Sequence, residues 1–214
     1  MNKPTKQPVS ELRDLAYRID PALWVREQLK VNPLPWQDDF LRAPRGASII
    51  ALTARQVGKT TVAAWVMAHT ALTQPGSLSV IACPAQRQSA EAVRRVHEYL
   101  TKIGTKLISD NVYGLELDNG SRVLALPGSD DSIRGLTVDG WIVADEAARL
   151  DDNLIAALRP MRARRPQTRF ATSLGTATAP VASGARSSME RSGSTLWGAA
   201  IFSNCCTRSC KRGC

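Results

Sequence analysis

The 214-residue chain has no long apolar run and no leader-like beginning. No stretch of 18 or more consecutive apolar residues occurs, which excludes a membrane-spanning helix, so no membrane partner is expected. The first twelve residues, MNKPTKQPVSEL, contain lysines without an apolar segment after them, and a secretory signal is therefore not expected either. Both absences predict a cytoplasmic protein.

Cysteine is nearly absent from the first 200 residues. The one cysteine there, Cys83, lies in an apolar, strand-like run and is expected to be a buried small hydrophobe. The other four crowd into the last ten residues with the spacing CC-x3-C-x3-C: Cys205, Cys206, Cys210 and Cys214. This spacing lacks the two separated C-x2-C pairs typical of a tetrahedral zinc site, so no metal is expected there.

Acidic residues are outnumbered, because 28 Lys and Arg face 19 Asp and Glu for a net charge of +9. Residues 181–214 hold five basic side chains against one acidic side chain, so they supply +4 and the other 180 residues supply +5. A mildly basic main part is compatible with a nucleic-acid partner without identifying one. The apolar share of 43% is enough for the core of one domain with an appendage.

Apolar runs alternate with helical patterns along the chain. The runs at 47–52, 77–84 and 140–144 read as buried parallel strands, and 168–173 as a shorter one. Helices are expected where Ser10 and Asp20 can cap, at 35–41, 59–73 and 85–104, and from Asp151 or Asp152 onward. Asn119-Gly120 predicts a hairpin with a primed turn. The expected fold is α/β, a mostly parallel sheet with helices on both faces and a β-hairpin insertion.

The segment TARQVGKT, residues 53–60, ends like a phosphate-binding loop but lacks its first glycine, because Thr53 stands there. Such a loop points backbone N–H groups and a helix N-terminus at phosphate oxygens, and Gly58 allows the close approach. Lys59 can reach the terminal phosphates, and the Thr60 hydroxyl is a suitable ligand for Mg²⁺. The alternative interpretation is an ordinary helix that begins with a glycine.

Two acids, Asp145 and Glu146, directly follow the expected strand at 141–144. Ligands of open parallel sheets bind at the carboxyl ends of strands, where the loop also lies. Asp145 is therefore expected to hold Mg²⁺, and Glu146 to orient and deprotonate a water molecule. The alternative is an acidic first turn of a helix. Both features together, each after an apolar strand, predict a nucleoside triphosphatase.

The loop TARQVGKT resembles the variant phosphate loop of bacteriophage terminase large subunits, in which a small residue replaces the first glycine. The segment SIRGLTVDGWIVADEAARL, residues 132–150, is similar to the family's segment through the acidic pair. PLPWQDDFL, residues 33–41, resembles its adenine-contacting element, and LIAALRPM resembles the helix after the acids. The resemblance covers about residues 33–170.

The resemblance implies a P-loop ATPase of the ASCE or RecA-like type, which drives double-stranded DNA into a capsid as a homo-oligomeric ring. Its implied partners are the portal protein and the small terminase subunit, in the cytoplasm of a host bacterium. Asp145 and Thr60 would hold Mg²⁺, Glu146 would be the catalytic base, and Gln37 would contact adenine. The ATP phosphates would be bound by Thr53, Ala54, Arg55, Gln56, Val57, Gly58, Lys59, Thr60 and Thr61.

Two of these implied residues have simpler alternatives. Arg55 would contact the γ-phosphate and respond to its loss, or else be a solvated loop charge. Gln37 would be an adenine contact or else a surface glutamine. Trp36, beside it, is expected in the core. A basic cluster, Arg159, Arg162, Arg164, Arg165 and Arg169, suits DNA phosphates, but a solvated basic edge is favoured because no aromatic residue interleaves it.

The chain departs from the family after the acidic pair. Only Thr172 and Ser173 are left to match the family's Ser/Thr coupling motif. After Asp152 the only acid is Glu190, so a two-metal nuclease site, and DNA cleavage, are not expected. The expected division is a helical segment at 1–32, an incomplete ATPase domain at 33–177, and a low-order tail at 178–214. The hypothesis for the tail is a truncated large subunit that ends in a shifted reading frame. The alternatives are an inactive remnant or a helicase-like ATPase.

Overall fold

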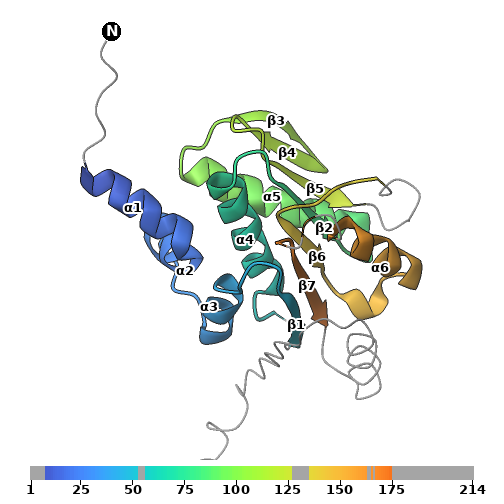
Figure 1. The fold of residues 1–214 in the computed structure, drawn as a ribbon. Helices are drawn as coiled ribbons and strands as arrows, with labels where there is room; N and C mark the ends of the chain where they lie inside the picture. Colours follow the sequence, from blue (N-terminus) through green and yellow to red (C-terminus); the bar gives the residue numbers. More distant parts are fainter. Residues whose placement is uncertain (1–7, 53–55, 127–134, 163–164, 166, 175–214) are drawn as a thin grey trace, which may run out of the picture.

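The computed structural model describes residues 8–52, 56–126, 135–162, 165 and 167–174 (Figure 1). Its centre is a seven-stranded sheet in the order β1-β7-β6-β2-β5-β4-β3. The strands are β1 Ser48–Leu52, β2 Leu78–Ala82, β3 Leu107–Asn111, β4 Gly114–Leu117, β5 Arg122–Leu126, β6 Trp141–Ala144 and β7 Arg169–Leu174. The chain is thus an α/β protein, as the alternating pattern predicts.

Five neighbouring strands are parallel and two are not. β1, β7, β6, β2 and β5 pair in parallel, whereas β4 is antiparallel to both β5 and β3. The hairpin of β4 and β5 therefore extends the main sheet through β5. One strand, β7, separates β1, which leads into the loop, from β6, which ends at the acidic pair.

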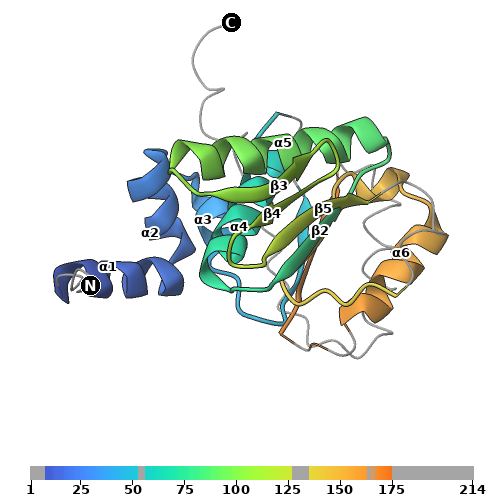
Figure 2. The same cartoon turned by 90° about the horizontal axis from the view of Figure 1, so that it is seen from above.

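Helices cover both faces of the sheet, with α5 on one side and α6 on the other (Figure 2). The α-helices are α1 Pro8–Ile19, α2 Pro21–Trp24, α3 Pro35–Leu41, α4 Lys59–Thr73, α5 Gln86–Lys102 and α6 Asp152–Leu158. A π-helix, η1, spans Val25–Leu29, and 3-10 helices span Ala147–Arg149 (η3) and Arg159–Arg162 (η4). No helix in the described ranges is long and apolar enough to cross a membrane.

Alternate residues of the central strands face two separate cores. Ile81, Val143 and Ala171 belong to the larger core, which α4 and α5 cover together with α2, η1 and α3. Their neighbours in sequence, such as Ala82 and Ile142, face the smaller core beneath α6. This period of two, with both sides apolar, explains why these strands appear in the sequence as continuous apolar runs.

Two local expectations need correction. Ser10 lies inside α1, which begins at Pro8, because proline is favourable in the first turn of a helix. The turn between β4 and β5 is not a primed two-residue turn, since only Gly120 has a positive φ, of 78°, and a type I′ turn needs two such residues. The Asn119 side chain instead donates to the carbonyl oxygen of Ala71, which ties the turn to α4.

Other local expectations are confirmed. The Asp20 carboxylate accepts hydrogen bonds from the amides of Ala22 and Leu23 and so caps α2. Asp151 accepts from the amide of Asn153 at the start of α6, which ends at Leu158, where a 3-10 turn follows. Strand β3 was not expected, because its sequence LISDN has only two apolar residues and they are adjacent, without a strand-like alternation. In the structure four of its five residues are exposed.

His69 of α4 fastens the N-terminal helices to the sheet domain. Its Nε2 lies 2.7 Å from the carbonyl oxygen of Tyr17 in α1, so this nitrogen carries the proton and donates it. The Trp24 ring meets the imidazole edge-on, with centroids 5.6 Å apart. Only 5% of His69 is exposed, and burial lowers its pKa from 6.5 to about 4.

The buried imidazole predicts a pH-dependent stability. Because the folded-state pKa of about 4 lies below the unfolded value, the unfolded chain binds the proton first, and the free energy of unfolding falls as pH drops from 6.5 to 4. The full loss is about 3 kcal/mol, at about 1.4 kcal/mol per pKa unit. Urea unfolding at pH 7.5 and pH 5 measures the part of this loss that falls between those two pH values, about 2 kcal/mol.

His69→Gln keeps a donor but cannot titrate, so it should lose this part of the pH dependence. His97→Gln removes the chain's other histidine, in α5 beside Asp110, and should keep the part that belongs to His69. An unchanged pH dependence in His69→Gln would show the assignment to be wrong.

Candidate functional site

The end of the predicted phosphate loop is a tight turn into α4. Gly58 precedes the helix with a φ of 87°, which strongly favours glycine, and Gln56 has a φ of 61°. Lys59 is the first residue of α4 and is half-buried. Thr53, Ala54 and Arg55 lie outside the described residues, so their predicted roles stay predictions.

The side chain of Gln37 in α3 holds this turn by a hydrogen bond to its backbone. Its Nε2 donates to the carbonyl oxygen of Val57 at 3.3 Å, and its Oε1 accepts from the amide of Leu34 at 2.9 Å. A Cβ at position 58 would come within 2.8 Å of the same Nε2. With 5% exposure Gln37 is not a surface glutamine, which rejects that alternative; Trp36 is in the core as expected. The adenine contact stays a prediction.

A hydrogen bond joins the first turn of α4 to Asp145 at the end of β6. The Thr60 hydroxyl donates to Asp145 Oδ2 at 2.7 Å, across 85 positions of sequence. Asp145 is 7% exposed and directly follows β6, and its amide donates to Ala82 at the end of β2. The carboxyl ends of β2 and β6 and the start of α4 therefore meet at one edge of the sheet.

Glu146 takes an unusual backbone conformation beside this bond. Its φ is 50°, and its amide donates to Oδ1 of Asp145 at 3.0 Å. Its half-buried carboxylate forms an ion pair with Arg149 at 3.3 Å. Three non-glycine residues of the described chain have a positive φ, and two of them, Gln56 and Glu146, lie at this edge. Such strained residues concentrate at functional sites.

The available metal ligands are few and are oxygens. The described residues contain no group of three or more His, Cys, Asp and Glu able to hold a metal ion. At this site Thr60 and Asp145 supply a hydroxyl and a carboxylate in direct contact. This set fits Mg²⁺, which keeps several waters and binds through one or two carboxylates together with substrate phosphates.

Two further residues lie beside the site: Arg95, whose contact was not predicted, and Cys83, for which only burial was predicted. Arg95 of α5 donates from Nη1 to the Thr61 hydroxyl at 3.1 Å; the sequence offers no signal for this contact, because Arg95 lies on an ordinary amphipathic helix. Cys83 follows β2 and is buried as expected. Burial, with smaller contributions from Asp145 and Glu146, raises the pKa of its thiol to about 12, so it remains protonated.

The basic cluster lies elsewhere and is not a uniform solvated edge. Arg165 is exposed, but Arg169, the first residue of β7, is half-buried, with its guanidinium 5.2 Å from the Trp141 ring centroid. For Arg169 the expectation of a solvated side chain is therefore wrong. The side chains of Arg159 and Arg162, and residue Arg164, lie outside what the structure describes.

Comparisons with known proteins identify the family and agree with the fold. The family model described as "Terminase large subunit, T4likevirus-type, N-terminal" matches residues 50–177. The large terminase ATPase domain of a Thermus phage is similar in structure, with a TM-score of 0.63 at 22% identity, over 72% of this chain and 69% of that one. No curated protein gives a significant match.

The large terminase of bacteriophage HK97 is similar with a TM-score of 0.64 at 14% identity, over 82% of this chain. The large terminase of a thermophilic bacteriophage gives 0.52 at 16% identity, over 73% of this chain. The matched parts are 42% and 38% of those two proteins, so this chain covers less than half of their length. At these identities the likenesses establish the fold alone.

The Gln37 contacts predict a specific loss of order in the loop. Gln37→Leu removes both side-chain hydrogen bonds and leaves the Leu34 amide and the Val57 carbonyl without these partners. The free energy of unfolding should therefore fall by about 1–3 kcal/mol. Hydrogen exchange at residues 56–60 should also accelerate. Gln88→Leu is the matched control, since Gln88 accepts from the Ala85 amide at the start of α5 but is exposed. Equal effects of the two substitutions would refute the supporting role.

Proposed function

The chain belongs to the family of terminase large subunits, and from this premise we propose that it is an ATP-hydrolysing motor domain for packaging double-stranded DNA into a capsid. The observation that carries the proposal is the 2.7 Å hydrogen bond from Thr60 to Asp145. It joins the two sequence features that the chemistry requires, a phosphate loop and an acidic strand end, which are far apart along the chain.

ATP would bind with its phosphates at the turn before α4. The backbone amides of 56–60 and the positive end of a 15-residue helix favour anions there. Lys59 would contact the terminal phosphates, with Arg55 as a further contact to the γ-phosphate. Gln37 lies next to the turn through Val57, which supports its assignment near the nucleotide.

Thr60 and Asp145 would hold Mg²⁺, which when bound offsets the negative charge of the phosphates. Glu146 would orient a water molecule and accept its proton. The water oxygen then bonds to the γ-phosphorus as the bond to the β–γ bridging oxygen breaks, which yields ADP and phosphate. The ion pair with Arg149 gives the Glu146 carboxylate a defined position before the substrate binds.

Strand β7 is suited to transmit the structural change that accompanies ATP hydrolysis. Thr172 lies in register with Ile50 of β1 on one side and Ala144 of β6 on the other. Thr172 and Ser173 therefore lie near the carboxyl end of β7, between the strand ends that lead into the loop and the acidic pair. We assign to them the coupling of hydrolysis to motion, as part of the same proposal.

The wider assembly belongs to the proposal as well. Because the chain spans less than half of the HK97 protein, translocation of DNA would require the additional parts that a complete large subunit carries. The proposed partners are double-stranded DNA, the portal protein, the small terminase subunit and further copies of this chain in a ring. A fold without turnover is the competing outcome, and hydrolysis measurements distinguish the two.

Two substitutions separate binding from hydrolysis. Lys59→Ala should weaken MgATP binding at least tenfold, because it removes the main side-chain charge on the phosphates. Glu146→Gln should keep binding but lower kcat by a factor of about 100 or more, the usual contribution of a general base. ATP hydrolysis is measured with and without duplex DNA, and binding by calorimetry.

Lys106→Ala and Glu11→Gln are controls, because both side chains are exposed and lie away from the loop and the acidic pair, Glu11 on α1 and Lys106 between α5 and β3. Turnover that neither Lys59→Ala nor Glu146→Gln reduces would exclude this site as the catalytic centre. Normal MgATP binding without turnover in the unmodified chain would establish the inactive alternative.

A further inference from the structure

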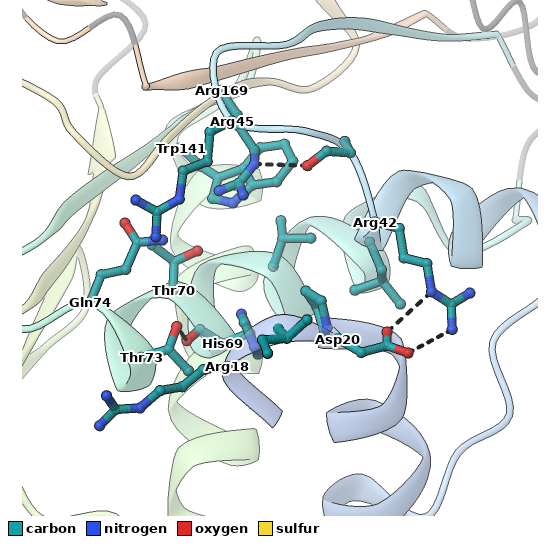
Figure 3. Close-up of a pocket in the computed structure, with 15 residues that line it drawn as sticks. Arg18, Asp20, Arg42, Arg45, His69, Thr70, Thr73, Gln74, Trp141 and Arg169 are labelled. Atoms are coloured by element: carbon teal, nitrogen blue, oxygen red, sulfur yellow. Dashed lines mark hydrogen bonds and ion pairs between the residues drawn. The ribbon is translucent and has the colours of Figure 1, made fainter. Parts of the chain in front are cut away.

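A hollow lies at the amino-terminal ends of β6 and β7, away from the carboxyl ends where the loop and the acidic pair lie. Its volume is about 690 Å³, and it is bordered by the ends of α1, α3 and α4 and by the first residues of β6 and β7. In Figure 3 the labelled polar side chains surround this space, with Arg45, Gln74 and Thr70 on the same side as Arg169. The volume is in the range of small-ligand sites.

The hollow is strongly basic. Four arginines and one carboxylate line it, and the carboxylate, Asp20, is already bound by Arg42 through two hydrogen bonds of 3.1 and 2.9 Å. In the part of the chain that the structure describes, Arg18, Arg45 and Arg169 have no carboxylate partner. Arg18 and Arg45 are exposed to solvent, and Arg45 Nη1 also donates to Gln167 Oε1 at 3.0 Å, whereas Arg169 is half-buried. The hollow therefore carries three positive charges that no described carboxylate pairs.

Arg169 is the residue best placed to bind an anion. Its Nε donates to the carbonyl oxygen of Ala43 at 3.0 Å and its guanidinium lies against Trp141, so its orientation is fixed. Its two terminal nitrogens have no acceptor among the described residues, although a guanidinium carries four more donor hydrogens there. Burial and the nearby charge of Arg45 lower its pKa from 12.5 to about 10. An anion in the hollow would relieve both unfavourable effects.

Helix ends supply part of the missing negative charge, but not all of it. The last turns of α1 and α4 border the hollow, and each contributes at most about half a negative charge. Three uncompensated arginines exceed this by about two charges. Several α4 carbonyls are also already occupied, since that of Thr70 accepts from Gln74 and that of Ala71 from Asn119.

We propose that this hollow binds the phosphate groups of a ligand, at a site separate from the nucleotide site. Planar guanidinium groups bind phosphate oxygens in pairs, and two of them, Arg45 and Arg169, approach the same space. The hydroxyl of Thr70 and the amide of Gln74 add neutral hydrogen-bonding groups. The phosphates can come from a free polyphosphate or from a nucleic-acid backbone, and the two arms of the test distinguish these sources.

The test uses the full chain carrying Lys59→Ala, so that phosphate binding at the loop is weakened and binding at the hollow is distinguished from it by the hollow variants. Pyrophosphate is titrated by calorimetry at constant ionic strength. We expect saturable binding that Arg45→Ala and Arg169→Lys each weaken about tenfold or more, because each removes one fork of paired donors. Arg94→Ala, on α5 outside the hollow, should bind as the parent does.

The second arm measures a 20-base-pair duplex by fluorescence anisotropy, with pyrophosphate as competitor. Displacement, together with weaker binding in the two hollow variants, identifies the nucleic-acid backbone as the source; pyrophosphate binding without any effect on the duplex identifies a free phosphate ligand. Absence of pyrophosphate binding, or equal binding by Arg45→Ala, overturns the proposal. So does equally tight binding of an aspartate decapeptide. Urea unfolding of Arg169→Lys verifies that a loss of binding is not a loss of fold.

Discussion

The contact on which the candidate site depends is the hydrogen bond between Thr60 and Asp145. It connects a helix start to a strand end, and each partner is fixed by its own backbone: Thr60 lies in α4, and the amide of Asp145 donates a hydrogen bond to the carbonyl oxygen of Ala82. Because Asp145 is nearly buried, a hydroxyl donor is worth more to it than it would be in water. Strand β7 sets the spacing of the two elements, since it lies between β1 and β6.

Much of the fold follows from the sequence because its signals are local. The helix expected at 59–73 is α4, and the apolar runs are β1, β2 and β6, since strands buried on both sides need apolar residues at every position. The position of β7 between β1 and β6 has no local signal, because nothing within a strand specifies its partners: Phe170 pairs with Ser48, 170 − 48 = 122 positions earlier, and Arg169 with Trp141, 169 − 141 = 28 positions earlier. Strand β3 was missed for another reason: it gains its place from pairing with β4, not from burial.

The candidate site divides in the same way. Gly58, Lys59, Thr60 and the acidic pair were predictable, because their chemistry requires those residue types at a strand end. Arg95 and the burial of Gln37 were not, since both depend on which helices pack beside α4. Arg169 shows the limit most clearly: in sequence it is one of five arginines in a basic cluster, and only the fold sets it apart by laying it over Trp141.

Strand β1 has a consequence that reaches beyond the site. Within the described residues it is the end strand of the sheet, with β7 as its neighbouring strand. The outer edge of an end strand is where a sheet can accept an added strand. Any segment that pairs there, from this chain or another, would brace the strand that leads directly into residues 56–60. The stiffness of the turn before α4 can thus be set by a strand added to β1, through main-chain bonds that are indifferent to side-chain identity.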